Sequence, residues 1–105
     1  MSVIAHNIRS THNIGSLFRT CDGLGVSHLF LTGYTPYPVI KNDQRLPHIR
    51  DKLHAQIRKT ALGAENTVPF SYHPELSTLL DHLKPVHTLI ALEQSPHSIP
   101  LPTFD

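Results

Sequence analysis

The sequence predicts an α/β fold in which a parallel sheet is covered by helices on both faces. Apolar runs and helical patterns alternate along the chain, and such alternation favours a parallel sheet. The first and third candidate helices have apolar residues at positions i, i+3, i+4 and i+7, and the second has them at i, i+4 and i+8, which places them on one face of each helix. The strand candidates include residues 26–32, expected to be well buried, and residues 86–92, a mostly apolar run, and such segments are typical of strands buried on both sides.

The first strand is predicted over residues 2–6 and the first helix over residues 13–24. The apolar stripe of that helix is formed by Ile14, Leu17, Phe18 and Cys21. Asn13 is expected to cap the start of the helix, and the segment 23–25, with two glycines, is expected to end it. Cys21 is therefore expected to be a packed thiol rather than a nucleophile.

The remaining elements follow the same alternation. Strands are predicted over 26–32, 68–72 and 86–92, and helices over 48–60 and 74–83, with Pro74 in the first turn of the last helix. Residues 33–38 contain Gly and two Pro and are expected to form a loop. Residues 1–95 are expected to form one domain or part of one, and residues 96–105, with three prolines, to form a connector or tail.

Composition and charge exclude several classes of protein. The chain has 105 residues, with 39% hydrophobic and 16% charged residues, and no run approaches the roughly 18 apolar residues of a membrane span. The single cysteine excludes an internal disulfide and a Cys-rich zinc site, and no spacing of the nine histidines indicates a metal site. Residues 1–64 carry eight Lys and Arg against three Asp and Glu, which suggests a surface for a polyanion or, alternatively, an ordinary solvated face.

The turn between the first strand and the first helix has the features of an anion site. Gly15 and Ser16 are expected in the first helical turn, where free N–H groups and the positive end of the helix dipole bind phosphate. Arg9 precedes the helix, and the helical period directs Arg19 out of the core, on the same end as Arg9. Two arginines at a helix start could bind a phosphodiester. The alternative is a capped surface helix with two solvated arginines.

Two further groups of residues have a functional and a structural interpretation. Arg50, Lys52, Arg58 and Lys59 lie on the outer face of the second predicted helix and either extend a nucleic-acid surface or are simply solvated. Tyr34 and Tyr37, in the proline-flanked loop, could stack on bases or anchor the loop.

The same stretch resembles motif 1 of the SpoU/TrmH family of RNA ribose 2′-O-methyltransferases, in the SPOUT superfamily. The family pattern is matched by Asn7, Arg9, Ser10, Asn13, Gly15, Ser16, Leu17, Arg19, Thr20 and Gly25. The segments 59–65 and 91–94 are also similar to family segments, so the resemblance runs from about residue 2 to residue 95.

The resemblance implies a Rossmann-like domain that methylates a ribose 2′-hydroxyl in tRNA or rRNA with S-adenosylmethionine, as a homodimer in the cytoplasm. Arg19 matches the arginine proposed to activate the hydroxyl, and Asn13 matches an asparagine of the same site. The family pattern assigns the RNA-binding positions to Asn7, Arg9, Ser10, Gly15 and Ser16. The strand end at Leu92, Glu93 and Gln94 matches a cofactor-binding segment, and no metal is implied.

The sequence departs from the family after this strand. The family's Gly-Asn-Glu and Ser-Leu-Asn-Val motifs, which form the trefoil knot around the cofactor, are absent from these residues. We therefore expect the N-terminal portion of a SPOUT domain without its knot, unable to bind the cofactor alone. The alternative is a non-catalytic RNA-binding or dimerising module that derives from a truncated methyltransferase.

Overall fold

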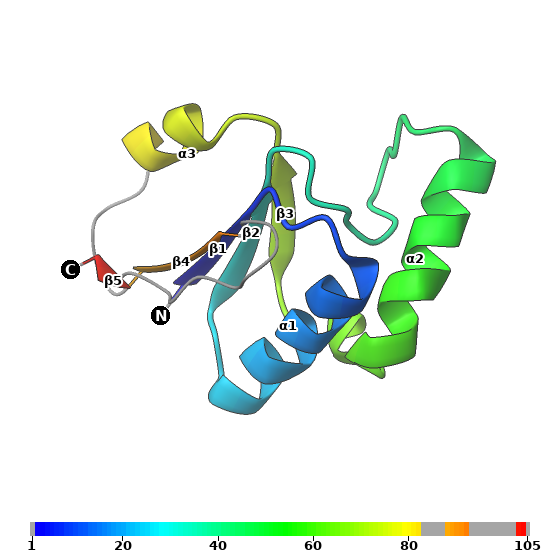
Figure 1. Cartoon of the computed structure of the whole chain (residues 1–105), viewed down its shortest axis with the longest axis horizontal. Helices are drawn as coiled ribbons and strands as arrows, with labels where there is room; N and C mark the ends of the chain where they lie inside the picture. The colour runs from blue at the N-terminus through cyan, green and yellow to red at the C-terminus, as the bar shows by residue number, and fades with distance from the viewer. Residues whose placement is uncertain (1, 83–87, 93–102, 105) are drawn as a thin grey trace.

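The computed structural model describes residues 2–82, 88–92 and 103–104. Figure 1 shows one sheet with helices on either side of it. In chain order the elements are β1 (Ser2–His6), α1 (Thr11–Leu24), β2 (His28–Thr32), α2 (Pro47–Ala61), the 3-10 turn η1 (Ala64–Asn66), β3 (Phe70–His73), α3 (Leu76–His82), β4 (Thr88–Leu92) and β5 (Thr103–Phe104). The predicted alternation of strands and helices is confirmed.

The sheet has the strand order β3-β2-β1-β4-β5. β1 pairs in parallel with β2 and β4, and β2 pairs in parallel with β3, as the alternation predicted. β5 pairs with β4 in the antiparallel direction, so two residues of the expected connector join the sheet. The other residues of that connector lie outside the described part of the chain.

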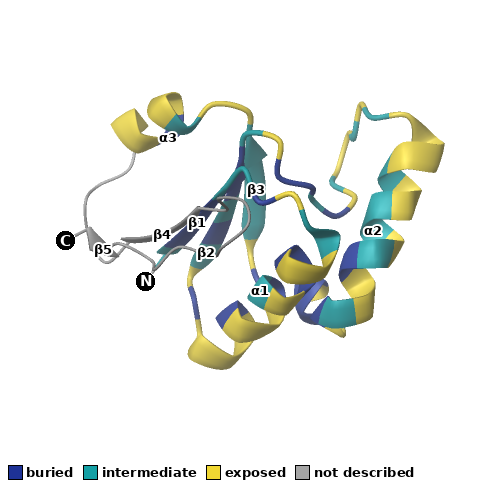
Figure 2. Cartoon of the chain, viewed as in Figure 1, coloured by how far each residue is buried: buried dark blue, intermediate teal, exposed yellow. Residues whose placement is uncertain are grey.

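The two faces of the sheet pack against different helices. Residues Val3 and Ala5 of β1 belong to the core under α1 and α2, whereas Ile4, between them, packs with Leu79 of α3. This follows from the alternation of side chains along a strand. Figure 2 shows the buried residues concentrated in the sheet and on the inner sides of α1 and α2. The expectation of helices on both faces is confirmed.

Two helix boundaries differ from the predictions. The helix α1 begins at Thr11, and Ser10 rather than Asn13 is its N-cap, because the Ser10 side chain accepts a hydrogen bond from the Asn13 N–H. The helix ends at Leu24, and Gly25 is its C-cap, with a φ of 66° that fits the expected glycine stop. The helix α3 begins at Leu76, so Pro74 precedes the helix.

Candidate nucleic-acid interface

The loops that follow β1 and β2 lie at the same edge of the sheet. The parallel pairing brings the ends of these strands together, with His6 opposite Thr32 on one side and Leu92 on the other. In open parallel sheets, ligands bind outside the carboxyl ends of the strands. The candidate site is therefore built from the loop 7–10 and the loop 33–46.

Asn7 joins these two loops. Its side-chain oxygen accepts a hydrogen bond from the N–H of Tyr34 at 3.1 Å. Gly33 has a φ of 67°, and a Cβ there would lie 1.9 Å from the same oxygen of Asn7. Only glycine at position 33 allows this close approach. Through the hydrogen bond to Tyr34, Asn7 holds the loop after β2 in place, a role that the sequence pattern did not predict.

Arg9 is exposed and lies beside Tyr34. The guanidinium carbon of Arg9 is 5.0 Å from the centroid of the Tyr34 ring, the distance of a cation–π contact. The sequence predicted Arg9 as an anion-binding residue but not its aromatic neighbour, which is 25 positions away in the chain. The pair gives this edge both a positive charge and an aromatic ring.

The start of α1 differs from the predicted anion site. Because the helix begins at Thr11, Gly15 and Ser16 lie in its second turn, where helix geometry commits their N–H groups to intrahelical bonds. Gly15 is buried against α2, and a Cβ there would lie 1.9 Å from Thr60 Oγ1 and 2.4 Å from the carbonyl oxygen of Ile57. The expectation of free N–H groups at Gly15 and Ser16 is therefore wrong, and Gly15 is needed for helix packing.

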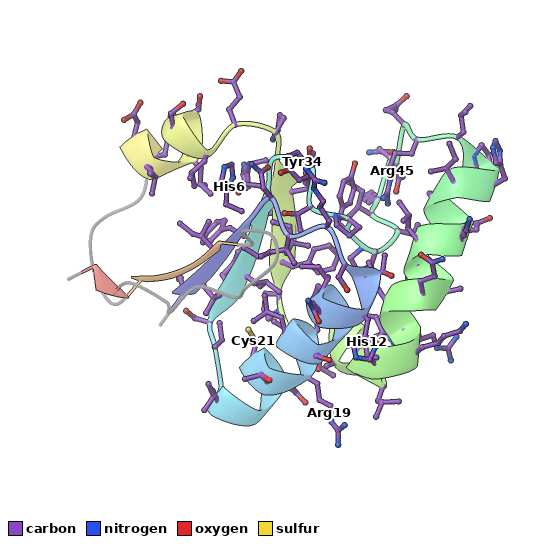
Figure 3. The ribbon with its side chains drawn as sticks, viewed as in Figure 1. His6, His12, Arg19, Cys21, Tyr34 and Arg45 are labelled. Carbon is purple, nitrogen blue, oxygen red and sulfur yellow. The ribbon has the colours of Figure 1, made fainter. Side chains whose placement is uncertain are left out.

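Arg19 is exposed, as the helical period predicted, but it is not near Arg9. It lies eight residues after the start of α1, about 12 Å along the axis. Figure 3 shows Arg19 pointing outward at one end of the molecule and Tyr34, the neighbour of Arg9, at the other. The expectation that both arginines share one end is wrong, because facing outward does not fix position along the axis.

The Arg19 guanidinium makes no hydrogen bond or ion pair with another described residue. Asn13 is exposed on the same helix, about 9 Å along the axis and about 120° around it from Arg19 by helix geometry. The two residues therefore do not form a contiguous site on this surface. Arg19 is available to an external group.

The Arg45 side chain binds other residues of the same chain. It forms an ion pair with Asp43 at 2.7 Å and donates hydrogen bonds to the carbonyl oxygens of Tyr37 and Pro38 at 2.9 and 3.0 Å. The hydrogen bonds that the Arg45 side chain donates to the Asp43 carboxylate hold the pKa of that carboxyl well below its usual range. The charge count had included Arg45 in the surface, but its side chain closes the loop after β2.

The basic residues of α2 remain on the surface. Lys52, Arg58 and Lys59 are exposed, and Arg50 forms an exposed ion pair with the adjacent Asp51 at 3.4 Å. An exposed pair of this kind contributes little stability. The α2 surface thus keeps the charge that the sequence predicted.

The other candidate residues have simple environments. Cys21 is buried, and burial raises the pKa of its thiol to about 11, so it is not poised as a nucleophile. Leu92 ends β4 beside β1, while Glu93 and Gln94 lie outside the described residues.

Within residues 2–82, 88–92 and 103–104, no three His, Cys, Asp or Glu side chains lie close enough together to act as metal ligands. No helix in that part of the chain is long and apolar enough to cross a membrane.

Together, the fold and this edge define a class: an α/β domain with a parallel sheet whose carboxyl edge and adjacent helices carry exposed cations. The model of the SpoU rRNA methylase family matches residues 1–105, and the chain belongs to that family. It is also similar in fold to an rRNA methyltransferase from Sinorhizobium meliloti, with a TM-score of 0.61 and 18% sequence identity. That match covers 94% of this chain and 41% of the other. A comparison with curated proteins finds no match.

Proposed function

We propose that this chain forms the RNA-facing part of an enzyme that methylates a ribose 2′-hydroxyl in tRNA or rRNA. The observation that carries the proposal is the exposed Arg19 guanidinium on α1, which no described residue pairs, in a chain that belongs to the SpoU rRNA methylase family. Asn13, about 9 Å away along the same helix, is proposed to contact the bound RNA separately from Arg19. The exposed Arg9 supports contact with RNA phosphate near the β1 end.

The chemistry assigned to Arg19 is orientation and charge stabilisation. A guanidinium remains protonated at neutral pH, so it is a poor general base. Its planar fork instead binds the ribose and an adjacent phosphate and stabilises the charge that develops on the 2′-oxygen. Substrate phosphate assists the loss of the hydroxyl proton. S-adenosylmethionine supplies the methyl group when bound, and Leu92 at the end of β4, with Glu93 and Gln94 that follow it in the sequence, is proposed to contact it.

The proposal is tested with methyl-labelled S-adenosylmethionine and RNA, on the protein in the full length that its gene encodes. Ribose methylation blocks alkaline cleavage of the neighbouring phosphodiester, so the label is expected in alkali-resistant dinucleotides. Arg19→Lys keeps the charge and removes the fork, and is expected to abolish transfer while RNA binding persists. A rate near that of the wild type in Arg19→Lys would overturn the role of the guanidinium.

A second candidate function is a non-catalytic RNA-binding or dimerising module. It is supported by the exposed cations of the described part of the chain, which suit RNA binding with or without methyl transfer: Arg9, Arg19, Lys52, Arg58 and Lys59. RNA binding without any methyl transfer would support it. We also propose a homodimer in the cytoplasm, and analytical ultracentrifugation of the purified protein tests the dimer.

A further inference from the structure

The three tyrosines of the chain line one hollow at the carboxyl edge of the sheet. The hollow has a volume of about 400 Å³, within the range of small-ligand sites, and its walls include Arg9, Tyr34, Tyr37, Arg45, Leu53 and Tyr72. The tyrosines come from the loop after β2 and from β3, so the hollow forms only when the sheet is assembled.

The inner wall of the hollow is held rigidly. The Tyr37 ring stacks on Tyr72 with centroids 4.1 Å apart and planes at 17°, and the Arg45 guanidinium carbon lies 3.7 Å from the Tyr37 centroid. The Tyr72 hydroxyl donates a hydrogen bond to the carbonyl oxygen of Gly33. Both faces of Tyr37 are therefore occupied, and this ring anchors the loop instead of binding a base.

The outer wall has the opposite character. Tyr34 is 57% exposed, although its backbone is fixed by the hydrogen bond to Asn7. Arg9 lies against its ring and is itself exposed. An aromatic ring on a fixed backbone beside a guanidinium plane can stack on an unpaired base with little loss of conformational freedom. Such stacking needs a base that is not already paired in a duplex.

We propose that this hollow binds one unstacked nucleobase of single-stranded RNA, which stacks on Tyr34 while Arg9 contacts the adjacent phosphate. The proposal rests on the proposed function in one respect, namely that the chain binds RNA. It adds the form of the RNA, a loop or single strand rather than a regular helix. Base recognition at this edge is separate from Arg19, which lies about 12 Å along α1 from the start of that helix.

The composition of the chain makes the proposal directly measurable. These 105 residues contain no tryptophan, so the intrinsic fluorescence of this chain comes from the three tyrosines of the hollow. We expect a short single-stranded RNA to quench this fluorescence saturably, after correction with free tyrosine for absorbed light. The same sugar–phosphate chain with abasic residues is expected to bind more weakly and to leave the emission unchanged.

Variants of Tyr34 separate stacking from charge. Tyr34→Leu is expected to weaken single-stranded RNA binding roughly 5- to 150-fold, the range for loss of one base–aromatic stack, whereas Tyr34→Phe keeps the ring and the affinity. Leu24→Ala removes an equally exposed apolar side chain from the end of α1 and serves as the matched control. Circular dichroism checks that each variant is folded.

The outcomes distinguish the two proposals. Equal affinity of Tyr34→Leu and wild type, with salt-dependent RNA binding retained, would overturn the base site and leave the proposed function standing. Equal affinity for the abasic and the intact strand would also overturn it. Absence of any RNA binding by the wild-type protein would overturn both.

Discussion

The two faces of the sheet differ in how they are stabilised. Among the described side chains, the core under α1 and α2 contains thirteen buried residues, with Phe18, Leu29 and Ile57 fully enclosed. The core under α3 contains Ile4 and Leu79, with Phe30 and Leu76 partly buried against them. Because buried apolar area dominates stability, the helices α1 and α2 hold this part of the fold together.

The face under α3 also carries polar groups on the strands. His28 Nε2 lies 2.9 Å from Ser71 Oγ, which lies 2.8 Å from His73 Nε2. The His28 ring packs on Phe30 with centroids 4.3 Å apart. One face is thus a large apolar layer, whereas the other combines a small apolar layer with imidazole side chains. The difference predicts which substitutions and conditions affect each face.

The largest expected effect is the loss of a central aromatic ring. Phe18→Ala removes a fully buried side chain that also contacts Phe70 edge to face, and is expected to cost about 3–5 kcal/mol of unfolding free energy. Leu79→Ala, on the face under α3, is expected to cost about 2 kcal/mol. Urea unfolding followed by circular dichroism measures both, and equal losses would contradict the comparison.

A smaller effect is expected where α1 crosses α2. Gly15→Ala places a methyl group against the Ile57 carbonyl and Thr60, and is expected to cost about 1–3 kcal/mol because neither helix backbone can yield freely.

Gly23→Ala is the matched control in the same helix. No atom lies within 4 Å of its added Cβ, so this variant is expected to stabilise the protein by about 0.5–1 kcal/mol. The same unfolding measurement compares both variants, and a shift of equal sign would show that the close approach at Gly15 does not matter.

The smallest expected effect is a pH dependence of the face under α3. Burial, and then the nearby His73, lowers the pKa of His28 below its usual value, so the unfolded chain takes up a proton more readily than the folded one. Unfolding free energy is therefore expected to fall as pH drops from 7 to 5.

His28→Gln is expected to reduce this dependence, and the midpoint of urea unfolding across that pH range measures it. His48→Gln, at an exposed position of α2, is expected to leave the pH dependence unchanged. A pH profile of His28→Gln identical to that of the wild type would remove His28 from the explanation.

Local pattern was sufficient for much of the fold. The strands and helices lie within about three residues of their predicted positions, and residues 83, 86 and 87 of the predicted elements lie outside the described part. The outward direction of Arg19 and the burial of Cys21 followed from the helical period. These features depend on residues a few positions apart, so their periodicity can be observed in the sequence itself.

By itself, the amino-acid sequence determined the alternation of elements, the parallel sheet and the membership of motif 1 residues in one strand–helix unit. Only the tertiary structure decided that Arg45 is a loop clamp, that Arg9 lies on Tyr34 and not beside Arg19, and that Gly15 serves helix packing. The clamp and the ring contact depend on how the loop after β2 folds back, and the packing of Gly15 brings together residues more than 40 positions apart. Side-chain periodicity carries no information about such approaches, because it records which face is buried and not what lies against it.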